Sequence, residues 1–83
     1  MTDAETDRAA LRALAAAVIE NAVVMATSRA GWIRPEERDA ARRFLTDDAD
    51  PRLESWLSIL DVDADAIRSA MRARLRGQRG KAA

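Results

Sequence analysis

Arginine is the most frequent single type of side chain in this sequence that could do chemistry. Six basic residues follow Ala66, and no acidic residue lies among them. Arg68, Arg72 and Arg76 are spaced by four, so on a helix they share one stripe, with Ser69 beside it. A helix that exposes such a stripe can enter the major groove of DNA and reach its phosphates. We therefore predict that Arg68, Ser69 and Arg72 face the groove of a bound duplex.

Basic residues near the C-terminus extend this charge. We predict that Arg76, Arg79 and Lys81 contact phosphates, the last two from a flexible tail. The alternative is an ordinary solvated face, because arginine forms helices well and cations are favoured near helix C-termini. Asp65 lies close to the stripe and would repel phosphates. Both interpretations remain open on the sequence alone.

The sequence lacks the side chains on which most enzymes rely. It contains no cysteine, histidine or tyrosine. Their absence removes the thiol nucleophile, the commonest general base and the commonest metal ligand. The carboxylates form no pair with a sheltered site between its members. We therefore predict a protein that is not an enzyme, with no catalytic residue and no cofactor.

Three closely spaced aspartates match part of a calcium-binding loop. Asp61, Asp63 and Asp65 match the first three ligand positions of a calcium-binding loop. The loop then requires glycine where Ala66 stands, and a bidentate glutamate where Arg72 stands. Both requirements fail, so we predict no metal site and assign these aspartates to turn formation and helix capping.

The spacing of apolar residues predicts a single all-α domain over residues 1–83, with no strand pattern. Thr2 and Glu5 fit a capping box at the start of the first helix, and Pro35 suits the first position of the second. The predicted parts are a long helix over 2–30, a second helix over 35–46, a helix-turn-helix-like unit over 51–76 and a basic flexible tail over 77–83.

The unit over 51–76 has the layout of a helix-turn-helix. Asp50-Pro51 signals the start of its first helix, and Asp63 can cap its second. Asp61 stands where the turn usually has glycine, but aspartate tolerates the left-handed conformation. Apolar residues occupy the positions at which such units pack their two helices together: Leu57, Leu60, Val62 and Ile67.

The first helix has a broad apolar stripe that is rich in alanine. We expect the other three helices to bury only part of this stripe. The helix is either the central core helix or a seam for a second copy or a partner. Asn21 is then a polar register element in that seam, or is merely exposed. The predicted dimer or partner interface comprises Leu14, Val18, Val23 and Met25. Trp32 and Ile33 are expected to plug the core between the first two helices.

The sequence also bears on location. It contains no run of eighteen or more apolar residues free of charge, so we expect no membrane-spanning segment. The acidic N-terminus is the reverse of a signal peptide. These two features predict a cytoplasmic protein.

A motif resembles a known family. Ala41-Arg42-Arg43-Phe44-Leu45 is followed by Leu60-Asp61-Val62-Asp63 and then by Ile67-Arg68. This pattern is similar to one shared by small phage and prophage proteins of alphaproteobacteria, and to the DNA-binding part of gene transfer agent transcriptional activators. The resemblance covers residues 35–75, and it departs from the family at Asp61, where glycine is usual, and at Ala64, where proline is usual. It implies a helical DNA-binding domain in transcriptional control.

These observations converge on one function with one alternative. We expect a transcriptional regulator of phage-derived genes that binds duplex DNA, either sequence-specifically or non-specifically. Its expected protein partners are a second copy of the chain and another transcription protein. The alternative is a protein-interaction module that docks its apolar N-terminal helix on a larger regulatory partner. Charge substitutions at Arg68 and Arg72 should affect the first function, whereas substitutions at Val18, Val23 and Met25 should affect the second.

Overall fold

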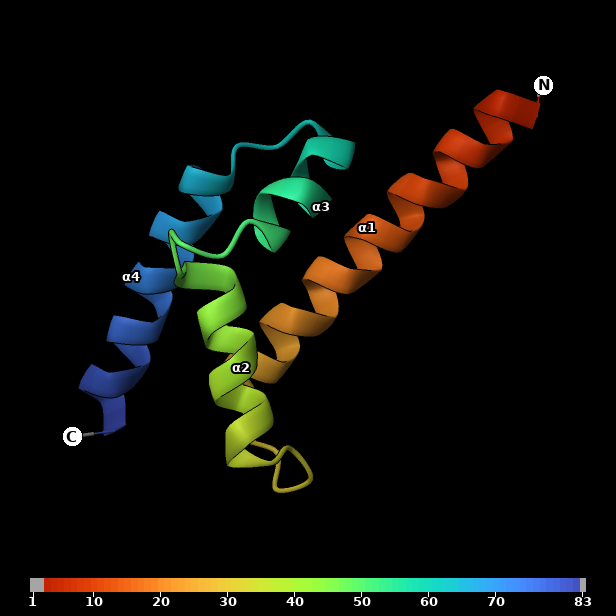
Figure 1. Ribbon diagram of the computed structural model, residues 1–83. Helices are drawn as coiled ribbons and strands as arrows, with labels where there is room; N and C mark the ends of the chain where they lie inside the picture. Colours follow the sequence, from red (N-terminus) through yellow and green to blue (C-terminus); the bar gives the residue numbers. More distant parts are fainter. Residues whose placement is uncertain (1–2, 83) are drawn as a thin grey trace.

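The computed structural model describes residues 3–82 of the 83-residue chain, with side chains from residue 3 to residue 78. The described part forms four α-helices and no strand, which confirms the predicted all-α fold (Figure 1). The helices are α1 (Asp3–Thr27), α2 (Pro35–Thr46), α3 (Arg52–Leu60) and α4 (Ala64–Ala82).

The ends of α1 and α2 follow from local chemistry. Pro35 begins α2 and two glutamates follow it in the first turn, where the helix dipole favours negative charge. The bounds of α2 agree with the sequence prediction. By contrast, α1 ends at Thr27, three residues before its predicted end. The capping box proposed for Thr2 lies outside the described residues.

The turn between α3 and α4 depends on two aspartates. Asp61 adopts the left-handed conformation with φ 58°, as expected for the residue that replaces the usual glycine. The backbone N–H of Val62 then donates to the carbonyl of Leu57 at 3.1 Å, which closes a Schellman-type end. Asp63 Oδ1 accepts the backbone N–H of Asp65 at 3.1 Å, so Asp63 caps α4 as predicted.

The C-terminal end differs from the prediction. We expected the last helix to stop near Arg76 and a flexible tail to follow, but α4 continues to Ala82 through Gly77. A glycine inside a helix costs only about 1 kcal/mol relative to alanine, and the neighbouring arginines are good helix formers. The two glycines of this segment therefore do not stop the helix.

A small core joins the helices. The cluster contains Leu45, Leu53 and Leu57, each at most 2% exposed, together with alanines of α1 and α2 and Met71 of α4. α1 packs on α2 and α3, whereas α4 packs chiefly on α2 and meets α3 less. The helix-turn-helix arrangement of α3 and α4 therefore remains a prediction.

Two apolar residues that we expected inside are outside. Trp32 is 73% exposed, although its neighbour Ile33 is buried as predicted. Val62, assigned to the turn packing of the helix-turn-helix, is 41% exposed.

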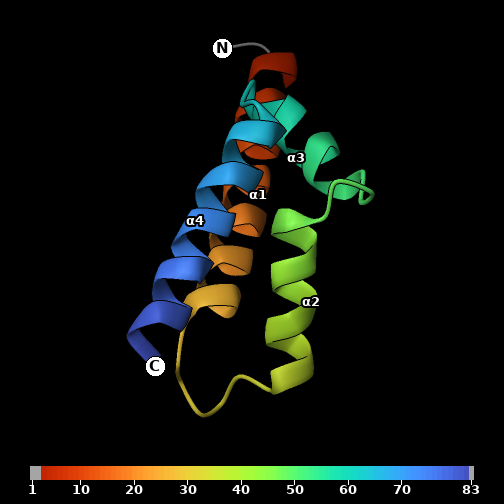
Figure 2. The ribbon, with the colours of Figure 1, turned by 90° about the vertical axis from the view of Figure 1, so that its left-hand side faces the viewer.

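α1 extends well beyond the rest of the domain. Every residue from 3 to 14 is exposed, and Figure 1 shows this N-terminal half running past α3. The α1–α2 loop and the C-terminal half of α4 lie at the opposite end of the molecule in both ribbon views (Figures 1 and 2). The radius of gyration is 14.6 Å, against about 12 Å for a compact domain of this length.

Candidate nucleic-acid interface

Arg68 is a buried anchor between α3 and α4. Its side chain is only 2% exposed. Nη1 donates to Glu54 Oε1 and to Asp65 Oδ1, both at 3.1 Å, and Nη2 donates to the backbone carbonyl of Asp50 at 3.3 Å. Asp48 Oδ1 lies 3.8 Å from Nε, which has no hydrogen-bond partner among the described residues. Burial alone would lower the pKa of Arg68, but the hydrogen bonds that it donates to Glu54 and Asp65 outweigh burial and raise the pKa.

The prediction that Arg68 faces a DNA groove from an exposed stripe is therefore wrong for this fold. Its guanidinium is enclosed and its donors are occupied by Glu54, Asp65 and the Asp50 carbonyl. A spacing of four residues advances a helical stripe by about 40° at each step. Arg68 consequently lies inside, Arg72 at the edge and Arg76 outside.

The other residues of the predicted stripe occupy different environments. The Arg72 side chain is 40% exposed and forms an ion pair with Asp48 at 3.0 Å. It also donates a hydrogen bond to the carbonyl of Thr46. Ser69 and Arg76 are exposed. The side chains of Arg79 and Lys81 lie outside those that the structure describes.

Carboxylates surround the start of α4. A shallow depression beside the α3–α4 turn is lined by Glu54, Asp63 and Asp65, together with Val62 and small residues. Phosphates approaching this end would meet negative charge at short range. The N-terminal end of α4 is thus a poor candidate for insertion into a DNA groove.

Asp50 holds the start of α3. Its Oδ1 accepts the backbone N–H of Arg52 at 3.0 Å, and its Oδ2 pairs with Arg52 Nη2 at 2.6 Å. The side-chain hydrogen bond from Arg52, followed by the backbone one, lowers the pKa of Asp50 from 3.8 to about 2.

Asp50 should therefore contribute to stability in a pH-dependent way. Because its pKa is lower in the folded state, the contribution is present above pH 3.8 and disappears as the pH falls towards about 2. We expect Asp50→Asn to melt below the wild type at neutral pH and at the same temperature as the wild type near pH 2. Thermal denaturation followed by circular dichroism at several pH values measures the difference, and a constant difference at every pH would contradict this role.

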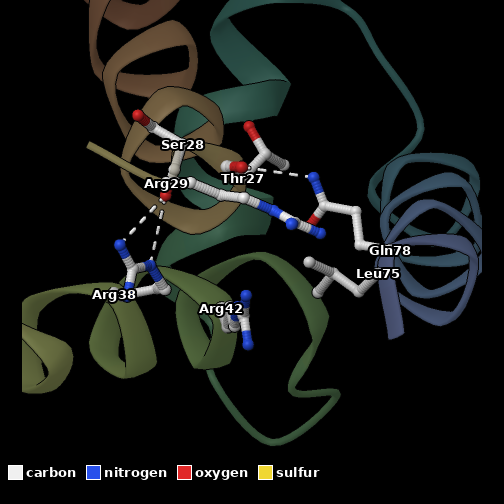
Figure 3. Close-up of a pocket in the computed structure, with 7 residues that line it drawn as sticks. All are labelled: Thr27, Ser28, Arg29, Arg38, Arg42, Leu75 and Gln78. Carbon is white, nitrogen blue, oxygen red and sulfur yellow. Dashed lines mark hydrogen bonds between the residues drawn. The ribbon is translucent and has the colours of Figure 1, made fainter. Parts of the chain in front are cut away.

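Arginines that the sequence interpretation passed over gather at the end of α1. Arg29 from the α1–α2 loop and Arg38 and Arg42 from α2 line a pocket of about 250 Å³. Figure 3 shows Leu75 and Gln78 of α4 on the far side of this pocket. Arg38 Nη2 donates to the carbonyl of Ser28 at 3.0 Å.

Two further hydrogen bonds tie this pocket to α1. Arg42 Nε donates to the carbonyl of Ala26, and Gln78 Nε2 donates to that of Thr27, at 3.0 and 3.2 Å. Cations are favourable at these carbonyls, since the C-terminal end of a helix carries partial negative charge. Each guanidinium has five N–H donors, so Arg42 keeps four that these bonds do not use.

A second pocket shares Leu75 with the first. That second pocket is lined by Thr46, Arg72, Leu75 and Arg76, and no carboxylate lines either of the two. We call the arginines of both pockets the basic face: Arg29, Arg38, Arg42, Arg72 and Arg76. The five ion pairs between described residues involve only Arg52, Arg68 and Arg72, so most of the basic face has no carboxylate partner there.

A second surface is apolar. A groove of about 400 Å³ between α1, α2 and α3 is lined mainly by apolar side chains, with Glu37 and Arg52 among its polar members. We call it the apolar groove. Its main apolar residues are Val18, Met25, Ala40, Phe44 and Trp56.

The predicted interface residues divide between this groove and the core. Val18 and Met25 line the apolar groove, and Leu14, one turn before Val18, is 52% exposed. Val23 does not line it, because it is partly buried against the core. Asn21 is an exposed member of the groove.

Comparison of the chain with protein-family models, with curated proteins and with solved structures finds no match. Within the described residues, no group of three or more carboxylates is arranged to hold a metal ion.

Despite the absence of an uncharged apolar run, α1 is long and apolar enough to cross a membrane by length and composition alone, with 11% of its most apolar window buried. Core helices and signal sequences have the same property.

Proposed function

We propose that this chain is a duplex DNA-binding regulator that contacts DNA phosphates through its basic face. One observation supports the proposal above the others: five arginines, four of them without a carboxylate partner among the described residues, line two pockets that share Leu75. Glu54 and Asp65 pair with Arg68 near the start of α4, and Asp48 pairs with Arg72. The other four arginines of the basic face give a chain of zero net charge a positive surface.

Guanidinium groups suit this role because they offer paired donors to phosphate oxygens. Arg38 and Arg42 are already oriented by the carbonyls of α1, so little side-chain entropy is lost when a phosphate binds. Arg29 and Arg76 are exposed and add charge on either side of Leu75. Control of phage-derived genes, including those of gene transfer agents, is the role that the family resemblance suggests for such binding.

Fluorescence anisotropy of a labelled duplex tests the proposal. Three or four phosphate contacts give a slope of log affinity against log salt of roughly −3 to −4. Arg76→Ala should reduce the magnitude of this slope by about one. Arg12→Ala is the matched control, since Arg12 is an exposed arginine on the N-terminal half of α1, far from the basic face. The proposal fails if the duplex does not bind at low salt, or if both variants change the slope equally.

A second function is favoured by the apolar groove. A protein-interaction module that docks through α1 would use the exposed Leu11 and Leu14 together with the groove, and it needs no DNA affinity. In that case the Arg76→Ala variant would bind the protein partner as tightly as the wild type does, whereas apolar-to-charged substitutions on α1 would abolish this binding.

A further inference from the structure

We propose that the apolar groove is occupied by the N-terminal half of α1 from a second copy of this chain, in a symmetric antiparallel dimer. This inference does not depend on DNA binding. It rests on the exposed surface of the monomer, on the position of the uncovered residues of α1 and on the position of the groove.

The first support is the amount of surface. A compact monomer of 9.1 kDa exposes about 4,900 Å², whereas this chain exposes 5840 Å². The excess of about 900 Å² is close to the roughly 800 Å² that each partner buries in an interface of standard size. The N-terminal half of α1 accounts for much of the elongation, because every residue from 3 to 14 is exposed, although Leu11 borders Ile59 of α3.

The second support is the arrangement of apolar residues along α1. Leu11, Leu14, Val18 and Met25 follow at helical spacing and so form one stripe, which we call the α1 stripe. Its N-terminal part is uncovered, with Leu11 46% and Leu14 52% exposed. Its C-terminal part, from Val18 to Met25, forms one wall of the apolar groove.

One helix thus carries both the projecting side chains and part of the groove that would receive them. A twofold axis makes such a surface complementary to itself, since each copy contributes both halves. An antiparallel pairing with Leu14 opposite the partner's Val18 brings Leu11 towards the middle of the partner's groove. Phe44 and Trp56 then cover the inserted leucines from α2 and α3.

A matched pair of substitutions on α1 tests the dimer. Leu14→Asp places a charge in the proposed seam. Val24→Asp places the same charge at a residue with nearly equal exposure, 50% against 52%, on another face of α1. Val24 lies about 100° around the helix from Met25. Light scattering after gel filtration should give twice the mass of 9.1 kDa for the wild type and for Val24→Asp.

Leu14→Asp should give the monomer mass and raise the dimer dissociation constant about 100-fold or more, because a carboxylate would be buried without a partner. Circular dichroism checks that the variant keeps its helices. A wild type that remains monomeric at high concentration would overturn the proposal. So would equal dissociation by both variants, or a monomer that instead inserts α1 into lipid vesicles.

The absence of cysteine allows a direct test of the register. An oxidised mixture of the Leu14→Cys and Val18→Cys proteins should form a cross-linked heterodimer faster than a mixture of Val24→Cys and Val18→Cys. A disulfide requires Cα atoms within about 7 Å, so only residues that face each other across the seam react readily. Equal cross-linking in the two mixtures would contradict the antiparallel register.

Discussion

Replacing Arg68 with methionine should lower the melting temperature by roughly 5–15 °C, because the lost charged hydrogen bonds are worth about 1–2 kcal/mol in a domain of this size. The substitution leaves Glu54 and Asp65 without their shared cation and leaves the Asp50 carbonyl without its donor. Methionine fills most of the volume, so the loss reflects the charges and hydrogen bonds more than a cavity.

Arg76→Met is the matched control for this prediction. Arg76 is an exposed arginine on the same helix, so its replacement should leave the melting temperature within about 2 °C of the wild type. Thermal unfolding followed by circular dichroism measures both variants. If Arg68→Met melts like the wild type but loses DNA affinity, Arg68 contacts DNA and is not a structural anchor.

Charge reversal on the basic face should have the largest effect on DNA affinity. The double variant Arg29→Glu/Arg76→Glu removes two cations, one from each pocket, and replaces them with groups that repel phosphates. We expect duplex affinity at low salt to fall about 100-fold or more. Both side chains are exposed and neither forms an ion pair within the described residues, so the fold should be unaffected.

Reversal at the opposite end of the molecule provides the comparison. Arg8→Glu/Arg12→Glu makes the same change in net charge on the N-terminal half of α1. Anisotropy titrations should then show only a small loss of duplex affinity, the loss that follows from the change in net charge. A comparable loss in both double variants would mean that binding depends on overall charge and not on the basic face.

Features that depend on neighbouring residues were predictable from the sequence. The bounds of α2 follow from Pro35 and the glutamates behind it. The left-handed Asp61 and the capping Asp63 follow from the turn chemistry of aspartate. The end of α4 was not predictable in this way, because two glycines raise the energy of a helix without preventing it.

Features that depend on contacts between distant residues were not predictable. Spacing by four placed Arg68 and Arg76 on one stripe but could not show which part of it would face inward. That choice depends on Asp48 and Glu54, which approach Arg68 only in the folded chain. The pocket around Arg29 joins α1, α2 and α4. The only local signal for this pocket in the sequence is the pair Arg38 and Arg42. These arginines are spaced by four on α2 and lie beside the C-terminal end of α1 in the fold.

Nuclear magnetic resonance can locate, residue by residue, the surface of this protein that binds DNA. The measurement is a titration of the isotopically labelled protein with a short duplex, in which the backbone amide shifts are followed residue by residue. We predict the largest shifts at Ser28, Arg29, Arg42, Arg72 and Arg76, with none in the apolar groove or at the start of α4. Shifts centred on Asp63 to Arg68, or no shifts at low salt, would contradict the proposal that the basic face binds DNA.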